Sequence, residues 1–341
     1  MWDRFLRACR REPVDATPVW FMRQAGRYMA EYRKIREKHT LLEICKTPDL
    51  ATEVTLQPVR ALGVDAAILF ADILLPLEPM GAPFEFAAGE GPVFEAPVRT
   101  AAAVERLRVI EPDELDYVLR AIRQIRGELD GKTPLIGFAG APFTLASYVV
   151  EGGKSQNYAN AKRMMYDAPE TWHALMHKLS EVVRRYLRAQ VDAGAQAVQL
   201  FDSWVGALSP SDYRDYVAVH VRHILADIET TGVPVIHFGT GTAALLESMK
   251  EAGGSVIGID WRVPMEQARR RLGADVALQG NLDPLLLPAP RSLLTRRIDE
   301  ILAGVGPGSG HVFNLGHGIL PDTPPDAVKW VTDTVHERSA R

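Results

Sequence analysis

The chain reads AVQLF at Ala197–Phe201 and PVIHF at Pro234–Phe238, with the helical pattern Ser211–Thr231 between these two apolar runs. Both runs are short and rich in β-branched or aromatic residues, which is typical of buried strands. A strand, a helix and a second strand in this order predict a parallel pair joined by a right-handed crossover. This stretch therefore indicates an α/β fold.

The same alternation extends in both directions along the chain. Six further apolar runs are predicted strands: Pro18–Phe21, Asp65–Phe70, Pro134–Phe138, Ser255–Ile259, Asp275–Gly280 and His311–Asn314. Further helical patterns separate the runs: Pro48–Leu62, Pro112–Leu129, Pro169–Ala193, Thr242–Ala252, Pro264–Leu272, Ser292–Ala303 and Pro325–Glu337. Strand–helix units repeated in this way predict a (β/α)8 barrel of the TIM type, with the active site at the C-terminal ends of the strands.

We expect residues 1–341 to form a single barrel domain, because no low-complexity tract or shift in composition marks a boundary. Two insertions interrupt the regular pattern. The first, at about residues 23–47, follows the first strand and carries a dense cluster of charges. The second, at about residues 80–98, is rich in Gly, Pro and Phe and is expected to form a hairpin.

The composition excludes several classes of protein. A net charge of −4 argues against a nucleic-acid partner or an anionic membrane, since both require a dominant basic field. No apolar run is long enough to span a membrane, and charges begin at Asp3, so we expect no signal peptide. Cys9 and Cys45 provide neither a disulfide framework nor a CxxC metal motif. We therefore expect a cytoplasmic protein.

Polar residues at the predicted strand ends indicate the chemistry of the site. Arg23, Arg27 and Arg36 follow the first strand, and Asp72 follows the second. Guanidinium groups bind carboxylates or phosphates through two parallel hydrogen bonds. The strand ends carry no nucleophile beside a base and no carboxylate cluster suited to a metal. From its position alone, Asp72 fits a helix N-cap as well as a functional anion.

Six segments resemble, in order, the motifs of the uroporphyrinogen decarboxylase family. They are FADIL at 70–74, YVVEGG at 148–153, QLFDSW at 199–204, NLGHG at 314–318 and the two longer signatures FMRQAGRY at 21–28 and GFAGAPFT at 137–144. The resemblance runs from about Arg4 to Val335. It implies a cytoplasmic carboxy-lyase of porphyrin and heme biosynthesis that acts as a homodimer without a metal or an organic cofactor.

The resemblance also implies the substrate, uroporphyrinogen III, a reduced tetrapyrrole with four acetate and four propionate side chains. The acetates would be converted stepwise to methyl groups, giving coproporphyrinogen III. Decarboxylation needs an electron sink, which other enzymes borrow from a cofactor. Here a pyrrole ring protonated on carbon can accept the electrons, so the site needs an anion near the pyrrole N–H groups, cations around the carboxylates and a proton donor.

Residue roles follow from the matched positions. The resemblance implies that Asp72, Arg27 and His317 are catalytic, with Asp72 accepting hydrogen bonds from the pyrrole N–H groups. It implies a substrate-binding set of Arg23, Gln24, Ala25, Gly26, Arg27, Arg36, Asp72, Tyr148, Ser203 and His317. A free guanidinium has a pKa above ~12 and is a poor acid. We therefore favour carboxylate binding by the arginines and keep acid catalysis by Arg27 as the alternative.

Several of these residues also have structural interpretations. Tyr148 fits a helix-packing residue, and Ser203 and His317 fit capping residues. Phe138 and Phe201 either pack on the macrocycle or fill the barrel, and Arg33 fits a surface ion pair.

Three other functions remain open. A zinc-dependent, corrinoid-linked methyltransferase of the same fold would need thiolate ligands, commonly His-x-Cys, where this chain has His237-Phe238-Gly239. A non-catalytic tetrapyrrole carrier would need the arginines but not Asp72. A phosphate-binding barrel would show a glycine-rich loop late in the chain, of which Gly316-His317-Gly318 is a faint echo.

Overall fold

The predicted apolar runs form a curled parallel sheet in the computed structural model, which describes residues 3–87, 91–306, 308 and 310–341. Parallel strands covered on both faces read as nearly continuous apolar runs, which is why these segments lack alternation. Within the described residues seven strands pair in the order β1-β4-β5-β6-β7-β8-β9. Their bounds are Ala67–Ile68, Leu135–Gly140, Ala197–Asp202, Val235–Gly239, Val256–Gly258, Ala277–Gln279 and His311–Val312.

The first predicted strand, Pro18–Phe21, is not a regular strand. Val19 makes an isolated parallel bridge to Phe313, and the N–H of Phe313 donates to the carbonyl of Pro18 at 2.8 Å. On the other side, the Val19 carbonyl accepts from the N–H of Asp65 at 2.7 Å. The Asp65 carboxylate accepts a hydrogen bond from the Val19 N–H, so a side chain stands where a neighbouring strand would supply a backbone carbonyl. The segment nevertheless joins the two edges of the sheet and closes the ring.

A chain of buried polar side chains crosses the interior of the ring. The indole N–H of Trp20 donates to Gln279 Oε1 at 3.0 Å, and Gln279 Nε2 donates to Gln199 Oε1 at 2.9 Å. Gln199 in turn contacts the sulfur of Met22. All four residues are buried. Buried amides are tolerated here because each finds a partner.

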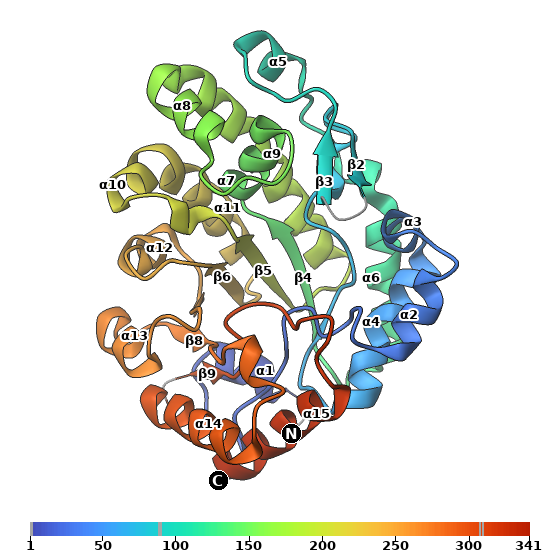
Figure 1. Cartoon of the computed structure of the whole chain (residues 1–341), viewed down its shortest axis with the longest axis vertical. Coiled ribbons are helices and arrows are strands. Elements are labelled where there is room, and N and C mark those ends of the chain that lie inside the picture. The colour runs from blue at the N-terminus through green and yellow to red at the C-terminus, as the bar shows by residue number, and fades with distance from the viewer. Residues whose placement is uncertain (1–2, 88–90, 307, 309) are drawn as a thin grey trace.

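Helices surround the strands, with α12, α13 and α14 on one side and α4 and α6 on the other (Figure 1). The α-helices are α1 Arg4–Cys9, α2 Ala30–Arg36, α3 Leu41–Lys46, α4 Pro48–Leu62, α5 Ala101–Arg106, α6 Asp116–Leu129, α7 Pro142–Glu151, α8 Ala159–Asp167, α9 Pro169–Asp192, α10 Pro210–Tyr213, α11 Val219–Glu229, α12 Leu246–Ala252, α13 Met265–Leu272, α14 Arg291–Val305 and α15 Pro325–Ser339. Short 3₁₀ turns are η1 Leu75–Leu77, η2 Pro112–Leu115, η3 Val205–Ala207 and η5 Pro284–Leu286, and η4 Arg214–Ala218 is a π-helical turn.

Two helices differ most from their predicted extents. The pattern Ser211–Thr231 is divided by η4 into α10 and α11. The helix predicted from Thr242 begins only at Leu246, because the Thr242 hydroxyl bonds back to the Gly239 carbonyl instead of capping a helix. The hairpin predicted within residues 80–98 is present as β2 (Phe84–Ala87) and β3 (Gly91–Phe94), an antiparallel pair. The remaining residues of that stretch, 88–90, lie outside the described part of the chain.

Candidate active site

Residues 22–28, which follow the bridging segment Pro18–Phe21, are fixed to the barrel by buried side-chain amides. Asn314 Oδ1 accepts from the N–H of Met22 at 3.0 Å. The Gln24 side chain accepts from the N–H of Phe21 at 3.1 Å and donates to the Ala66 carbonyl at 3.1 Å. Gln24 is fully buried. Its side chain therefore positions this segment, and its predicted place in the substrate-binding set stays a prediction.

Arg23 leaves this segment with a left-handed backbone, at a φ of 59°, and reaches across to the last barrel loop. A Cβ on Gly318 would collide with the Arg23 side chain, so glycine is required there for the close approach. Arg23 is exposed at the mouth. Desolvation and the neighbouring charge of Arg27 lower the pKa of Arg23, while Tyr148 and Asp72 oppose that change.

Asp72 follows β1, and one of its two carboxylate oxygens accepts a hydrogen bond. Oδ1 accepts from the N–H of Leu74 at 2.8 Å, and no residue in the described part of the chain bonds to Oδ2. The following turn, η1, begins at Leu75 with Leu74 as its N-cap, so Asp72 does not cap a helix. Burial raises the pKa of Asp72, and the Leu74 hydrogen bond and the charge of Arg23 oppose the rise.

Tyr148 and Ser203 come from neighbouring barrel units. Tyr148 lies on α7, with its ring 6.0 Å from the ring of Trp204 and at about 67° to it. Burial raises the pKa of Tyr148, and the charges of Asp72 and Arg23 also act on it. Ser203 follows β5; its carbonyl accepts from the Thr240 hydroxyl, and its own hydroxyl has no partner among the described residues. Arg23, Asp72 and Tyr148 are thus electrostatic neighbours.

His317 sits in the last barrel loop with its tautomer fixed. Nδ1 accepts from the N–H of Gly318 at 2.7 Å, so the proton of the neutral ring is on Nε2. Burial, followed by the charges of Arg23 and Arg262, lowers the pKa of His317 to about 4. At neutral pH the ring is uncharged and can donate one hydrogen bond from Nε2.

Arg27 and Arg36 lie further out on the loop. Both are exposed, and the charges of both act on the pKa of the buried Tyr32. Arg36 also donates to the carbonyl of His39. Arg33, for which we considered a surface ion pair, instead donates to the carbonyls of Arg27 and Tyr28 at 3.0 and 2.9 Å and so holds the loop.

Aromatic residues line one side of the strands. The rings of Phe138 on β4 and Phe201 on β5 are 5.5 Å apart, and Phe201 lies 5.9 Å from Phe238 on β6. Phe238 is buried, whereas Phe201 is only half-buried. Phe201 is therefore the member of the row with surface left for a ligand.

Arg262 is a residue at the mouth that the sequence prediction missed. It stands one position beyond the strand end at Asp260-Trp261, where the predicted strand-end residues stop. Its guanidinium lies beside the ring of Trp261 and pairs with Asp260.

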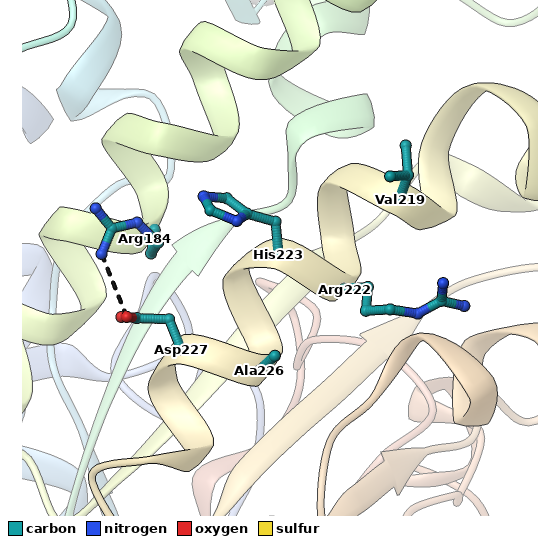
Figure 2. A pocket seen from close by; sticks show the side chains of 6 residues that line it. All are labelled: Arg184, Val219, Arg222, His223, Ala226 and Asp227. Carbon is teal, nitrogen blue, oxygen red and sulfur yellow. Dashed lines mark ion pairs between the residues drawn. The ribbon is translucent and has the colours of Figure 1, made fainter.

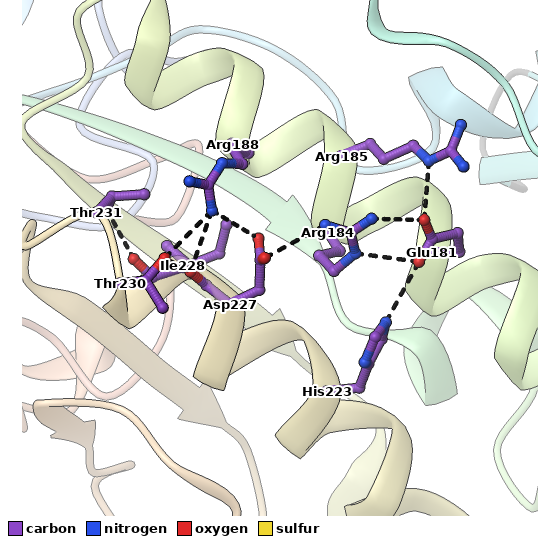
Figure 3. Close-up of polar contacts among 9 residues, drawn as sticks. All are labelled: Glu181, Arg184, Arg185, Arg188, His223, Asp227, Ile228, Thr230 and Thr231. Carbon is purple, nitrogen blue, oxygen red and sulfur yellow. Dashed lines mark hydrogen bonds and ion pairs between the residues drawn. The ribbon is translucent and has the colours of Figure 1, made fainter.

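A surface groove elsewhere is not the site. About 480 Å³ in volume, it lies on the outside of α9 and α11 and is lined by Arg184, Val219, Arg222, His223, Ala226 and Asp227 (Figure 2). Arg184 is already paired with Glu181 at 2.6 Å and with Asp227 at 3.3 Å, in a network that ties the two helices together (Figure 3). A cation neutralised in this way offers little to an anionic ligand.

The side-chain clusters and the helix lengths bear on metals and membranes. Among the residues that the structure describes, no three His, Cys, Asp or Glu side chains lie together so as to hold a metal ion. Within the same residues, no helix is long and apolar enough to cross a membrane.

Fold and site together define a parallel α/β barrel of the TIM type whose mouth combines several guanidinium groups with one partly free carboxylate. The family model described as uroporphyrinogen decarboxylase (URO-D) matches residues 2–338. The chain belongs to the uroporphyrinogen decarboxylase family.

Individual relatives agree with this assignment. The chain is 71% identical to a uroporphyrinogen decarboxylase of Sorangium cellulosum, over 98% of this chain and 96% of the relative. It is 58% identical to that of Carboxydothermus hydrogenoformans, over 100% and 97%. Among solved structures, a methyltransferase from Methanosarcina mazei superposes with a TM-score of 0.78 at 21% identity, covering 98% of both chains. At that identity the likeness supports the fold alone.

Proposed function

We propose that this chain decarboxylates the four acetate side chains of uroporphyrinogen III in steps, giving coproporphyrinogen III, without a cofactor. Membership of the family and the high identity to curated decarboxylases support this reaction. The observation that carries it is Asp72, whose carboxylate keeps one oxygen free at a mouth otherwise supplied with guanidinium groups.

The reaction uses the substrate's own ring as the electron sink. A proton added to a ring carbon makes the pyrrole cationic. The bond between the acetate methylene and its carboxylate then breaks, CO2 leaves, and the bonding electron pair neutralises the ring. Protonation of the exocyclic carbon and loss of the ring proton give the methyl group, so one proton is consumed for each CO2 released. Asp72 accepts hydrogen bonds from the pyrrole N–H groups and stabilises the developing positive charge.

The other proposed residues bind the acidic side chains. Arg23, Arg27 and Arg36 take carboxylates, since a guanidinium supplies two parallel donors. The backbone N–H groups of Ala25, Gly26 and Arg27 have no acceptor within the described residues, so the same loop offers further donors. The hydroxyls of Tyr148 and Ser203 and Nε2 of His317 supply neutral donors. In addition to Asp72, we assign Arg27 and His317 to contact with the reacting acetate.

Incubation of the full chain with uroporphyrinogen III under anaerobic conditions tests the function. Chromatography of the oxidised products should show porphyrins with seven, six and five carboxylates that give way to coproporphyrin. Chelator-dialysed protein should turn over at the same rate. A stoichiometric zinc requirement, or methyl transfer in place of CO2 release, would favour the methyltransferase alternative.

The assembly and location belong to the same proposal. A homodimer follows from the family resemblance, and sedimentation at micromolar concentration should give twice the 37.7 kDa chain mass. A fully active monomer would contradict it. A cytoplasmic location is supported by two buried, unpaired cysteines, Cys9 and Cys45. Cell fractionation would test it.

A further inference from the structure

Arg262 stands at the mouth of the barrel on the loop that follows β7. Three residues of this loop form a unit: Asp260, Trp261 and Arg262. Asp260 is 1% exposed, whereas the Arg262 side chain is 49% exposed, so the carboxylate lies inside and the guanidinium faces solvent.

The unit holds the guanidinium in one orientation. Asp260 Oδ1 accepts from the Arg262 backbone N–H at 2.9 Å, and Oδ2 accepts from Arg262 Nη1 at 2.8 Å. The guanidinium carbon lies 4.0 Å from the centroid of the Trp261 ring. Because Asp260 also accepts from the N–H of Gly241, its position does not depend on Arg262 alone. Nε and Nη2 of Arg262 have no acceptor in the described part of the chain. Ordered donors of this kind bind an anion with little further loss of side-chain entropy.

The unit adjoins the last barrel loop. A Cβ on Gly316 would collide with the backbone of Trp261, so the two loops are in close contact. The ring of Trp261 meets the ring of His317 edge to face, with centroids 6.5 Å apart. The charges of both Arg23 and Arg262 lower the pKa of His317, which lies within range of both cations. The charges of Arg27 and Arg36 act on Tyr32, and that of Arg27 also acts on Arg23.

We propose that Arg262 binds one carboxylate side chain of the tetrapyrrole on the His317 side of the mouth. This inference rests on the proposed function. A substrate with eight carboxylates requires several cations, and of the arginines on the loop after Phe21 only Arg23 acts on His317. Arg262 is therefore a substrate-binding residue, whereas Asp260 and Trp261 are positioning residues.

The chain offers a matched control. Arg291 stacks over the ring of Trp330, with its guanidinium carbon 4.3 Å from the centroid, and this pair joins α14 to α15. Arg291→Ala removes the same kind of stacking outside the unit formed by Asp260, Trp261 and Arg262. Arg262→Lys keeps the charge and loses the planar stacking, and it serves as the second variant if Arg262→Ala folds poorly.

Two readouts separate this inference from the proposed function. Arg262→Ala should raise KM for uroporphyrinogen about tenfold, as expected for the loss of one charged hydrogen-bonding partner, with kcat within about twofold of wild type. The KM of Arg262→Lys should lie between those of wild type and Arg262→Ala, and the KM of Arg291→Ala should match that of wild type. Fluorescence titration with uroporphyrin, the oxidised octacarboxylate, should show a similar loss of affinity in Arg262→Ala.

Wild-type protein that binds uroporphyrin but does not turn over uroporphyrinogen would overturn the function while the titration still tests Arg262. Unchanged KM and unchanged uroporphyrin affinity in Arg262→Ala would overturn the role of Arg262. The role of Arg262 would also be overturned if KM and uroporphyrin affinity were equally altered in Arg291→Ala, or if wild-type protein bound neither tetrapyrrole. A lower melting temperature with unchanged binding would show that Arg262 serves only to neutralise Asp260.

Discussion

Asp72 is held in place at one oxygen and left free at the other, which suits a group that must meet a charge formed during the reaction. Oδ1 is held by the N–H of Leu74, so the carboxylate does not need to reorganise when the ring becomes cationic. Because burial raises the pKa of Asp72, the carboxylate loses its charge at a higher pH than a free aspartate would. Activity that depends on this anion therefore falls on the acid side.

Asp72→Asn tests that role directly, because it keeps the size of the side chain and removes the charge. We expect kcat to fall by about 10²–10³, the usual effect of removing one preorganised electrostatic group, while KM changes less. Steady-state kinetics with thermal melts provides the measurement. Asp333→Asn, at an exposed i,i+4 pair with Lys329, should turn over like wild type. Normal turnover in Asp72→Asn would remove this residue from the mechanism.

Asp202 carries a second prediction at this scale, through its titration. Thr144 donates to Oδ1 at 2.9 Å, but Oδ2 is buried without a partner in the described residues. Burial raises the pKa of Asp202 to about 7. The folded state thus retains a proton that the unfolded chain releases near pH 4, and stability is lost as the pH rises from about 4 to about 7. The full loss is on the order of 4 kcal/mol.

Asp202→Asn should remove that loss. The melting temperature of the variant, relative to wild type, should therefore be higher at pH 8 than at pH 5. Asp299→Asn is the control, because pairing with Arg338 lowers the pKa of Asp299 and leaves nothing to titrate in this range. A difference between Asp202→Asn and wild type that is the same at both pH values would show that the carboxyl does not titrate there.

At the scale of elements, the sequence predicted best those segments whose signals are local. The prediction for α4 was correct at both ends, because Pro48 begins the helix and Gly63, with a φ of 68°, ends it. The helix α7 went unpredicted because most of its residues are buried and it has no polar face to give a period. Pro18–Phe21 failed as a regular strand because a partner distant in sequence, Asp65, replaces a ladder bond.

The same limit applies to the site. Local patterns locate the strand ends and so pointed to Arg23, Asp72 and Tyr148. In the structure the charges of Asp72 and Tyr148 act on the pKa of Arg23. The strand-end rule cannot tell which way a side chain points, and so did not show that the Gln24 amide is used by the Phe21 and Ala66 backbone. It also gives no reason to single out Arg262, whose orientation depends on the stacking against Trp261.

Lys178 supports a prediction at the element scale. Its ammonium donates from α9 to three carbonyls at the end of α5, those of Val104, Glu105 and Leu107, at 2.9, 2.8 and 2.7 Å. The Val104 carbonyl also accepts from the N–H of Leu107, whereas Lys178 supplies a partner to the carbonyls of Glu105 and Leu107, so it caps α5 from outside. Lys178→Met should lower stability by about 1.5–3 kcal/mol and speed amide hydrogen exchange in α5. Lys329→Met should change the melting temperature little, since exposed pairs contribute about 0–1 kcal/mol. Unaltered exchange in α5 would contradict the capping role.

At the scale of the whole molecule, closure of the ring depends on one carboxylate. Figure 1 shows α1, β9 and α15 together near both ends of the chain. Asp65 joins these parts: it accepts from the N–H of Val19 at 2.7 Å, from Arg4 on α1 at 3.2 Å, and pairs with His336 on α15 at 2.7 Å. The Asp65 side chain is only 12% exposed. The first and last elements and the bridging segment therefore meet at a largely buried charge.

Asp65→Ala should consequently destabilise the whole barrel. The substitution leaves the Val19 N–H unpaired and one guanidinium edge of Arg4 without its inner partner, and removing one side of a buried charged pair costs about 3–5 kcal/mol. In a chain of this size that loss should lower Tm by roughly 4–7 °C. Asp299→Ala is the matched control, because Asp299 also joins two helices through an arginine, Arg338, but at the surface, with both side chains more than a third exposed. Its loss should be below about 1 kcal/mol.

Because Val19 lies three residues before Met22, Asp65→Ala should also loosen the loop that carries Arg23. The KM for uroporphyrinogen should therefore rise even at temperatures well below the melting transition. If Asp65→Ala and Asp299→Ala melt at the same temperature, the backbone bonds to Phe313 and residue 65 are sufficient to hold the bridging segment, and the ring does not need this carboxylate to close.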